Sequence, residues 1–205
     1  MVAHLLFYLA FFIVLAYLLG SIPFGLVICH FLKIDLRLVG SGNTGATNVF
    51  RAAGPQWGIF VFVLDFLKGL LPTLLAMHMF SAPVLHIVVG SFAIMGHTWP
   101  VFAGFRGGKG VATGLGLLAA LHPLSFLMVF VYAVTVIMVT RIVSLASLSG
   151  SVAVVFLFLF FHVPQVYLVF SVLVMIFIFY LHRANIFRLI HGTENKLSFG
   201  KKEGS

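Results

Sequence analysis

Residues 5–29 read LLFYLAFFIVLAYLLGSIPFGLVIC, an apolar stretch that contains no charged side chain. A helix needs about 20 mostly apolar residues to cross the hydrocarbon core of a bilayer, which is about 30 Å thick. The stretch is longer than that, so it predicts a membrane span. It is also too long for a cleaved signal peptide, lacks a basic start, and contains Gly20, Ser21 and Pro23.

The composition of the whole chain agrees with this prediction. Of its 205 residues, 62% are hydrophobic and 8% are charged, and the mean hydropathy is +1.20. Soluble domains carry about 25% charged residues, so a soluble enzyme, a nucleic-acid-binding module and a disordered chain are excluded. The single cysteine, Cys29, excludes an internal disulfide. Because only four acidic residues could act as ligands, we expect no metal site and no cofactor.

Further long apolar runs predict the remaining spans. They lie at 57–77, 83–97, 123–140, 147–163 and 165–182. A seventh run, at 111–121, is too short to cross a normal bilayer alone, since a helix rises about 1.5 Å per residue. We expect a short helix there that its neighbours shield from lipid. The sequence thus predicts an all-α integral membrane protein with seven transmembrane helices. It forms a single domain, residues 1–205, with a polar tail from about residue 190.

The basic residues indicate the orientation. Counted along the chain, with 111–121 as the fourth run, Lys and Arg follow the first, third, fifth and seventh runs. The connections 78–83, 121–124 and 161–165 hold none. Cytoplasmic loops carry the excess of Lys and Arg, which predicts an N-terminus outside and a C-terminus in the cytoplasm. Within the spans only Asp65 and Lys68 are charged, and their i, i+3 spacing predicts that they pair. The loop charges are Lys33, Arg37, Arg51, Arg106, Lys109, Arg141, Arg183, Arg188, Lys196, Lys201 and Lys202.

The first basic connection concentrates glycines, hydroxyls and amides between two long spans. Residues 40–51 read GSGNTGATNVFR. Glycines let backbone N–H groups turn toward one point, and small polar side chains add donors, as in phosphate-binding loops. A flexible loop is the alternative for such a composition, and no Gly-Lys-Ser/Thr follows, so it is not a nucleotide P-loop. The candidate binding residues are Ser41, Gly42, Asn43, Thr44, Gly45, Thr47, Asn48 and Arg51.

A second glycine-rich segment, residues 96–113, reads GHTWPVFAGFRGGKGVAT. Its Gly107-Gly108-Lys109-Gly110 opens the short helix expected at 111–121. A helix start offers free N–H groups and partial positive charge, and Lys109 adds a full charge, so this is a second candidate phosphate site. The alternative is a basic turn that anchors the helix to lipid headgroups. Two such segments on one face of the membrane make ligand binding the better interpretation.

Two further segments carry candidate polar residues on the same side. Ser144 and Ser147 are three apart and could share a helix face, although helix capping and small-residue packing also explain them. His182, Asn185 and Arg188 would lie on one face of a helix at the end of the seventh span. The alternative is a helix end whose basic side chains extend to the membrane surface and keep their charges in water. One of the four acids, Glu194, follows closely and could simply neutralise a nearby Arg or Lys.

Taken in order, these segments resemble the bacterial membrane-integral acyl-phosphate:glycerol-3-phosphate acyltransferase family. The resemblance covers almost the whole chain, and the ordered set is far more specific than any one motif. Two positions depart from the family pattern. Arg106 stands where Lys is usual, and Ala184 stands where Glu is common. The second departure removes a carboxylate beside His182 and Asn185 and argues that no carboxylate base is needed there.

The resemblance implies a multi-pass enzyme of the bacterial plasma (inner) membrane whose active site faces the cytoplasm. Such an enzyme moves a fatty acyl group from acyl phosphate to the 1-hydroxyl of glycerol 3-phosphate in phospholipid biosynthesis. The products are lysophosphatidic acid (1-acyl-glycerol 3-phosphate) and inorganic phosphate. The expected partners are therefore acyl phosphate, glycerol 3-phosphate and membrane lipid, with no nucleic acid.

The resemblance also implies roles for residues. The loop from Ser41 to Asn48, with Lys109, would hold acyl phosphate. The pocket for glycerol 3-phosphate would comprise Arg51, Lys109, Ser147, His182 and Asn185. Gly107, Gly108, Gly110 and Ser144 complete the expected binding set. The expected catalytic residues are Asn185, His182, Lys109 and Ser41.

Acyl transfer passes through a tetrahedral oxyanion and requires proton removal from the attacking hydroxyl. Asn185 or loop N–H groups could stabilise the oxyanion. His182 is the only protein base that we consider, and we hypothesise that the leaving phosphate takes the proton instead. No covalent acyl-enzyme is expected, because Ser41 and Cys29 lack an evident His–acid partner. The main alternative function is a phosphate or glycerol-phosphate transporter, which the one-sided loops and the lack of an inverted repeat disfavour.

Overall fold

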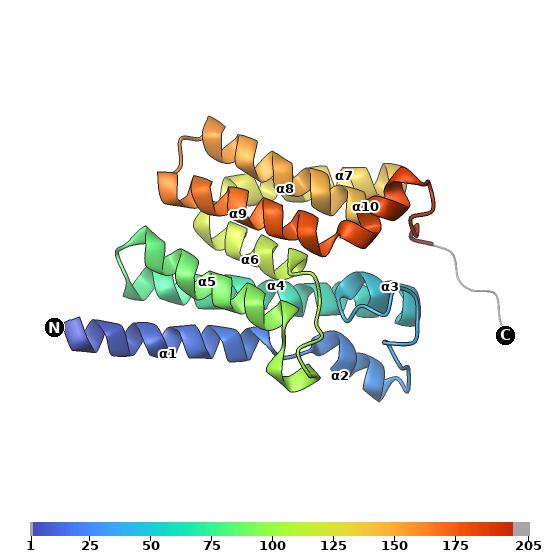
Figure 1. Ribbon diagram of the computed structural model, residues 1–205, viewed down its shortest axis with the longest axis horizontal. Coiled ribbons are helices and arrows are strands. Elements are labelled where there is room, and N and C mark those ends of the chain that lie inside the picture. The colour runs from blue at the N-terminus through green and yellow to red at the C-terminus, as the bar shows by residue number, and fades with distance from the viewer. Residues whose placement is uncertain (1, 199–205) are drawn as a thin grey trace.

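The computed structural model describes residues 2–198, and its secondary structure there is entirely helical (Figure 1). The helices in chain order are α1 (Val2–Gly20), α2 (Phe24–Phe31), α3 (Ala46–Ala53), α4 (Pro55–Met79), α5 (Pro83–Thr98), the short 3-10 helix η1 (Val101–Ala103), α6 (Val111–Leu121), α7 (Pro123–Thr140), α8 (Val143–Phe160), α9 (Gln165–Leu181) and α10 (Arg183–Ile190).

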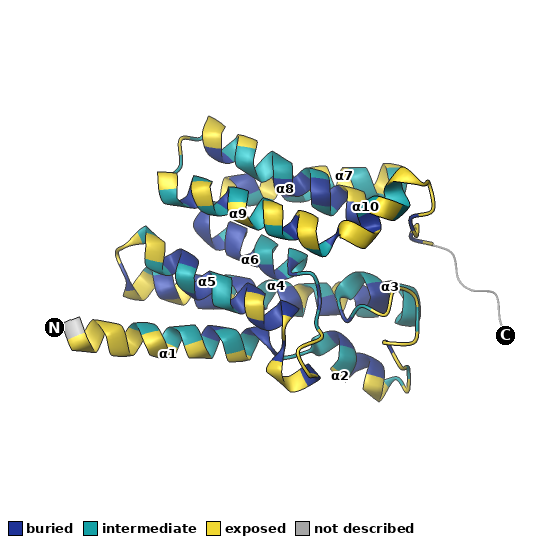
Figure 2. Ribbon diagram, in the orientation of Figure 1, coloured by how far each residue is buried: buried dark blue, intermediate teal, exposed yellow. Residues whose placement is uncertain are grey.

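The long helices run along one axis in two groups, with α6 between them. One group holds α1, α4 and α5, and the other holds α7, α8 and α9 (Figure 1). Figure 2 shows α6 as mostly buried and α1 as mostly exposed on its outer side. The large apolar side chains of α1 point outward, as expected where lipid is the solvent, with Phe7 68% exposed.

Proline sets where three of the long helices begin. Pro55, Pro83 and Pro123 each occupy the first turn of a helix, α4, α5 and α7 respectively. At that position the missing N–H costs nothing, because the first N–H groups of a helix have no intrahelical acceptor. The sequence therefore marks these starts directly, and each lies within two residues of the beginning of an expected apolar run.

The first apolar run is interrupted. The expected span 5–29 divides into α1 and α2, because Pro23 cannot donate a backbone hydrogen bond and its ring blocks a continuous helix. The break frees the carbonyl of Ile22, which accepts a hydrogen bond from Lys68 Nζ at 3.0 Å. The lysine inside the membrane thus satisfies a backbone group that the break exposes.

The short helix α6 packs tightly against α4 through glycines. A Cβ at Gly69 would overlap the backbone carbonyl of Thr113, and a Cβ at Gly116 would overlap that of Phe66. Thr113 Oγ1 also donates to the carbonyl of Asp65 at 3.0 Å. Small residues at such a crossing let two backbones approach closely, as is common between membrane helices.

Five described helical segments are long and apolar enough to cross a membrane, and a sixth is obtained if α9 and α10, bent by 65°, count as one span. This establishes a multi-pass integral membrane protein. The helix α6 is apolar but has only 11 residues. At about 1.5 Å per residue it covers roughly half of the hydrocarbon core.

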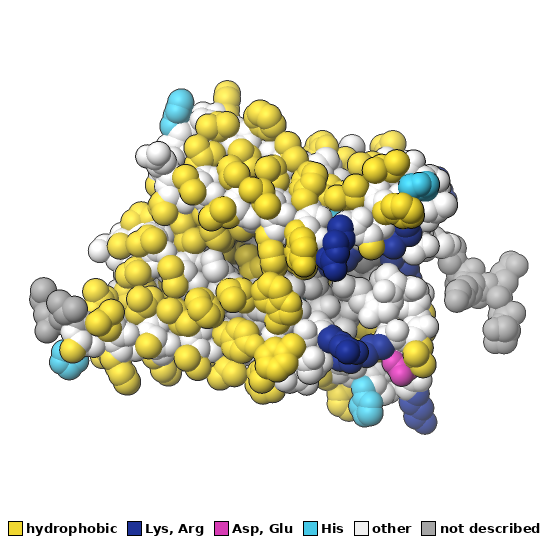
Figure 3. All heavy atoms as spheres, viewed as in Figure 1, with side chains coloured by type: hydrophobic (Ala, Val, Ile, Leu, Met, Phe, Trp, Pro, Cys, Tyr) yellow, Lys and Arg dark blue, Asp and Glu magenta, His cyan; other side chains and the backbone are white. Residues whose placement is uncertain are grey.

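The two ends of the bundle differ in chemistry. The uncharged turns α4–α5, α6–α7 and α8–α9 lie at the end where α1 begins, and the basic connections lie at the other end (Figure 1). Figure 3 shows Lys and Arg side chains toward that second end of the face in view.

The segment after α10 folds back onto the bundle. Leu197 is buried, and its N–H donates to the carbonyl of Arg141 at 2.8 Å. The polar tail expected from about residue 190 is thus structured up to residue 198. The remainder, with Lys201 and Lys202, lies outside the described residues.

Candidate active site

A polar cavity of about 140 Å³ lies at the basic end of the bundle. All four candidate segments contribute to it, as the sequence predicts. Eleven of the expected residues line the cavity: Ser41, Asn43, Gly45, Thr47, Asn48, Arg51, Lys109, Ser144, Ser147, His182 and Asn185. The expected residues Gly42, Thr44, Gly107, Gly108 and Gly110 do not line it.

Asn48 shapes the first loop from within. Its side chain is 1% exposed. Its Nδ2 donates to the carbonyls of Leu36 at 3.0 Å and Val39 at 2.9 Å, and its Oδ1 accepts from the N–H of Ser41 at 2.9 Å. Asn43 Oδ1 likewise accepts from the N–H of Gly45 at 2.9 Å. These two side-chain amides therefore hold the loop in one conformation.

The N–H groups of Gly107 and Gly108, which precede α6, form hydrogen bonds within their own loop. The N–H groups of Gly107 and Gly108 donate to the carbonyls of Thr98 at 3.2 Å and His97 at 3.0 Å. They are therefore not free to bind phosphate, contrary to the prediction from the glycine-rich pattern. A Cβ at Gly108 would overlap the imidazole of His97. Glycine fits here because this ring occupies the place that a Cβ would take.

Lys109 reaches from this loop across the cavity. Its Nζ donates to Asn185 Oδ1. Burial lowers the pKa of Lys109 to about 8; the charge of Glu194 opposes this shift, and Arg188 and Arg51 reinforce it. The ammonium group is thus a half-buried cation that titrates close to neutral pH.

Glu194 organises the α10 side of the cavity. Its Oε1 accepts from Asn185 Nδ2 at 2.6 Å and from Ser144 Oγ at 2.9 Å. Its Oε2 pairs with Arg188 Nε at 2.7 Å. Burial would raise the pKa of Glu194, but the hydrogen bonds from Asn185, Arg188 and Ser144 outweigh it and lower the pKa overall. The expected neutralisation of a nearby Arg is confirmed, and the carboxylate also orients Asn185.

His182 lies at the junction of α9 and α10, where the helix axis bends by 65°. His182 is the N-cap of α10, which carries Asn185 and Arg188, and its carbonyl accepts a hydrogen bond from the N–H of Ile186 at 2.8 Å. His182 and Asn185 thus reach the same cavity from the start of one short helix.

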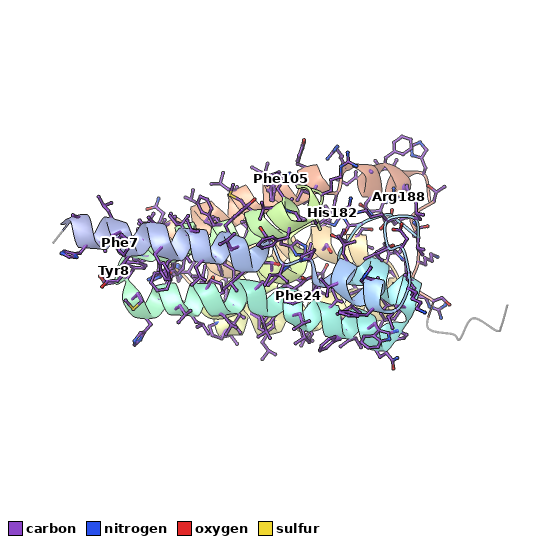
Figure 4. All side chains as sticks on the ribbon, turned by 90° about the horizontal axis from the view of Figure 1, so that it is seen from below. Phe7, Tyr8, Phe24, Phe105, His182 and Arg188 are labelled. Atoms are coloured by element: carbon purple, nitrogen blue, oxygen red, sulfur yellow. The ribbon has the colours of Figure 1, made fainter. Side chains whose placement is uncertain are left out.

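The His182 ring is buried, and its Nδ1 lies 2.8 Å from the carbonyl oxygen of Ile178. A carbonyl only accepts, so Nδ1 carries the proton and Nε2 of the neutral ring is an acceptor. Figure 4 labels His182 and Arg188 toward the end opposite Phe7 and Tyr8.

Arg51 and Ser147 approach the cavity from α3 and α8. Arg51 donates to the carbonyl of Asn195 at 3.0 Å, and its buried Nε has no hydrogen-bond partner within residues 2–198. Burial lowers the pKa of Arg51, with Glu194 opposing and Arg188 reinforcing the shift. Ser147 Oγ donates to the carbonyl of Val143 at 3.0 Å.

A buried ion pair lies next to the cavity, and one of its members, Asp65, lines it. Lys68 Nζ lies 2.8 Å from Asp65 Oδ1, which confirms the predicted pair. Lys68 Nζ also lies 3.2 Å from Nδ1 of His97. His97 Nδ1 lies 3.6 Å from Asp65 Oδ1 as well, so the imidazole contacts both members of the pair, and its Nε2 is the atom that a Cβ at Gly108 would overlap. Asp65 and His97 both line the cavity.

A second, apolar cavity of about 520 Å³ adjoins the polar one. The two share lining residues at the starts of α3, α6 and α8, with Phe62 of α4. The shared residues are Ala46, Thr47, Phe62, Val111, Val143 and Ser147. A polar head and an apolar chain of one molecule can therefore occupy adjoining spaces.

Sequence reasoning missed the contribution of His97 and the organising role of Glu194. His97 lies within the quoted segment 96–113, directly after Gly96, and its place in that segment was the available signal. Within residues 2–198, no group of three or more His, Cys, Asp or Glu side chains is arranged to hold a metal ion.

Comparison with known proteins identifies the family of the chain. The family model for glycerol-3-phosphate acyltransferase matches residues 10–192. The chain is 46% identical over 188 residues to a glycerol-3-phosphate acyltransferase of Aquifex aeolicus (strain VF5), covering 91% of this chain and 97% of that one. A relative of the same name from Geobacillus kaustophilus (strain HTA426) is 45% identical over 191 residues, covering 93% and 96%.

Two solved structures share the fold. Both are crystal structures of PlsY, an integral membrane glycerol 3-phosphate acyltransferase. The glycerol 3-phosphate form aligns with a TM-score of 0.89 and 42% identity, covering 93% of this chain and 96% of that chain. The lysophosphatidic acid form aligns with a TM-score of 0.87 and 40% identity, covering 94% and 96%. The chain therefore belongs to the glycerol-3-phosphate acyltransferase family of integral membrane proteins, as its ordered motifs predict.

Proposed function

We propose that this protein transfers a fatty acyl group from acyl phosphate to the 1-hydroxyl of glycerol 3-phosphate, at the cytoplasmic face of the bacterial plasma membrane. The products are lysophosphatidic acid and inorganic phosphate. One observation supports this function above all. A polar cavity with two cationic side chains, Lys109 and Arg51, adjoins a larger apolar cavity. Both substrates carry phosphate, and one of them also carries an acyl chain.

The proposed topology has seven spans, with α6 as the short one. The bundle supports this count because α6 lies along the longer helices and its turn into α7 is at the end where α1 begins (Figure 1). Lys and Arg are absent from the three turns at the end where α1 begins. By the excess of basic residues in cytoplasmic loops, the end with the polar cavity faces the cytoplasm. Glycerol 3-phosphate would enter from there.

Phosphate binding is assigned to Lys109 and Arg51, assisted by two helix starts. Ala46 and Thr47 open α3, and Val111 opens α6, and all three line the polar cavity. The first N–H groups of a helix lack intrahelical acceptors and carry partial positive charge, which favours an anion. The neighbouring Ser41 and Thr47 hydroxyls would add donors. These helix starts replace the Gly107 and Gly108 N–H groups, which the loop already uses.

The acyl carbon would sit where the two cavities meet, near Ser147. There the 1-hydroxyl oxygen attacks the acyl carbon, and the bond from that carbon to the phosphate oxygen breaks. Lys109 Nζ and Asn185 Nδ2 each have N–H groups beyond those used within the site, which could stabilise the oxyanion. No covalent acyl-enzyme is needed for this step.

The proton of the hydroxyl passes to the departing phosphate, so the substrate supplies the base. His182 Nε2 is an acceptor on the cavity wall, and we assign to it a hydrogen bond that orients the glycerol hydroxyl. A His182→Gln variant tests this division of roles. It should weaken binding of glycerol 3-phosphate more than it slows the chemical step. Intact binding with the chemical step abolished would instead make His182 the base.

A comparison of acyl donors tests the proposed reaction. Purified protein in liposomes is given glycerol 3-phosphate with acyl phosphate, acyl-CoA or acyl carrier protein, while lysophosphatidic acid and free phosphate are measured. Both products should appear in equal amounts with acyl phosphate alone. Turnover with acyl-CoA alone would refute the donor assignment. Uptake of glycerol 3-phosphate into the liposomes without lipid product would indicate transport.

A further inference from the structure

The apolar cavity follows one face of α8 along almost its whole length. The α8 residues that line it are Ser147, Gly150, Ser151, Val154 and Phe158, with Val143 and Ala146 at the start of the helix. They recur every three or four residues, the spacing that places side chains on one face of a helix. The cavity therefore begins at Ser147, beside the polar site, and continues toward the opposite end of the bundle.

Phe158 is the α8 residue that lines the cavity farthest from the polar site. This side chain is 2% exposed. Its ring meets the imidazole of His122, in the turn between α6 and α7, edge-on at 6.1 Å between centroids. Leu121 lines the cavity at the same level and belongs to the same core cluster as Phe158. The far end of the cavity is therefore built from packed side chains.

The length of this path corresponds to a common fatty acyl chain. Ser147 and Phe158 are eleven positions apart on one helix, which is about 16 Å at 1.5 Å per residue. An extended carbon chain with bonds of about 1.5 Å advances about 1.25 Å per carbon. About 13 carbons therefore fit beyond the reacting carbon before the chain meets the Phe158 ring.

Gly150 keeps this path open near its beginning. A Cβ built there lies 3.6 Å from Val129 Cγ1 and meets nothing closer, so the fold does not require glycine for packing. A larger side chain at this position would project into the cavity that Gly150 lines. Val154, one turn deeper, occupies the same face between Gly150 and Phe158.

We propose that Gly150, Val154 and Phe158 form a ruler on α8 that selects the length of the transferred acyl chain, with Phe158 as its end. This inference rests on the proposed function, because the chain measured is that of the acyl phosphate. Bulk at Val154 shifts the preference to shorter chains, since Val154 lies about 10 Å from Ser147, enough for about eight carbons. Removal of the Phe158 ring shifts it to longer chains.

The test is a competition among acyl phosphates of about 10 to 20 carbons, with the product ratios read by mass spectrometry. Val154→Phe should raise the ratio of the shortest product to the 14-carbon product at least about tenfold, since single methylenes in a fitted apolar pocket change selectivity by this order. Phe158→Ala should raise the ratio of the 20-carbon to the 14-carbon product by a similar factor.

Matched controls lie on the exposed face of the same helix. Phe156 is 66% exposed and Leu159 is 49% exposed, and neither lines the cavity. Phe156→Ala and Leu159→Phe should leave the product ratios within about twofold of the original protein. If Phe158→Ala does not fold, the product ratios of Val154→Phe alone test the proposed ruler.

The outcomes separate this inference from the proposed function. An unchanged product profile in the Val154 variant, with normal turnover by the original protein, would refute the ruler and leave the reaction intact. Profiles that shift equally in the exposed controls would also refute it. If the original protein turned over no acyl phosphate of any length, the proposed function would fail, and the ruler with it.

Discussion

Asn185 donates its side-chain N–H to Glu194 Oε1 at 2.6 Å, which fixes the direction of its amide. The amide oxygen then points to Lys109, from which it accepts a hydrogen bond. An amide oriented by a carboxylate cannot flip without placing its oxygen against that carboxylate. Glu194 thus sets which atoms Asn185 offers to the polar cavity.

The first prediction concerns removal of this carboxylate. Glu194→Ala leaves Arg188 unpaired and removes the acceptor of Asn185 and Ser144. The Arg188 side chain is 32% exposed and water can solvate it, so the main cost is the lost acceptor of the buried Asn185 and Ser144 groups, about 1–3 kcal/mol each. We therefore expect a lower melting temperature in detergent and at least about tenfold lower activity. Asp35→Asn is the control, because that carboxylate is exposed. A melting temperature equal to that of the original protein would contradict the organising role of Glu194.

The second prediction concerns pH. Lys109 has a pKa of about 8, so its positive charge is present below this pH and is lost as pH rises through it. The kcat/KM for glycerol 3-phosphate, which reports the free enzyme, should therefore fall with a midpoint near pH 8.

Lys109→Arg separates the charge of this residue from other groups that titrate. A guanidinium stays protonated throughout the range, so the variant should lose the alkaline limb, although its overall activity falls because the geometry differs. An identical alkaline limb in both proteins would assign the titration to another group.

The third prediction concerns the contact between Gly108 and His97. A methyl group at position 108 would overlap the imidazole, so Gly108→Ala should displace the loop that carries Lys109. We expect KM for glycerol 3-phosphate to rise by at least about tenfold. Gly104→Ala is the comparison, because nothing lies within 4 Å of a Cβ there. That variant bears only the strain of its positive φ, about 1 kcal/mol. Equal effects of both substitutions would show that the imidazole contact does not position Lys109.

The fourth prediction concerns the buried pair Asp65–Lys68. Asp65→Asn leaves the Lys68 ammonium without its carboxylate, and Lys68→Met leaves Asp65 facing His97 Nδ1 at 3.6 Å without its ammonium, so each should reduce the yield of folded protein. The double variant Asp65→Leu, Lys68→Met removes both charges and should recover folding. The folded double variant should nevertheless be inactive, because His97 loses the Lys68 contact that fixes its ring. Full activity of the folded double variant would show that the pair serves stability alone.

The spans could be predicted from the sequence because lipid imposes one strong requirement, long apolar segments with satisfied backbones. The break at Pro23 follows from local chemistry as well. The bend at His182 does not, because residues 165–190 contain no proline or glycine to mark it. The segment after α10 is held by contacts with residues far away in the sequence, such as the hydrogen bond from the Leu197 N–H to the carbonyl of Arg141. Such contacts are visible only in the three-dimensional structure.

The site was predictable as a set of segments but not in its internal arrangement. The residue types around Ser41, Lys109 and Asn185 indicate anion binding, and the cavity brings them together. Sequence cannot tell whether a glycine N–H faces a ligand or a carbonyl of its own loop, and Gly107 and Gly108 do the latter. For the same reason Asn48, expected to bind substrate, proves to hold its loop while it lines the cavity.

The short helix α6 depends on a neighbouring helix. Its 11 residues are too few for a stable span in lipid alone. Gly69 and Gly116 show that α6 fits onto a bare backbone surface of α4. The helix α6 is therefore stable in the bilayer only as a partner of α4, which precedes it in the chain and covers its backbone.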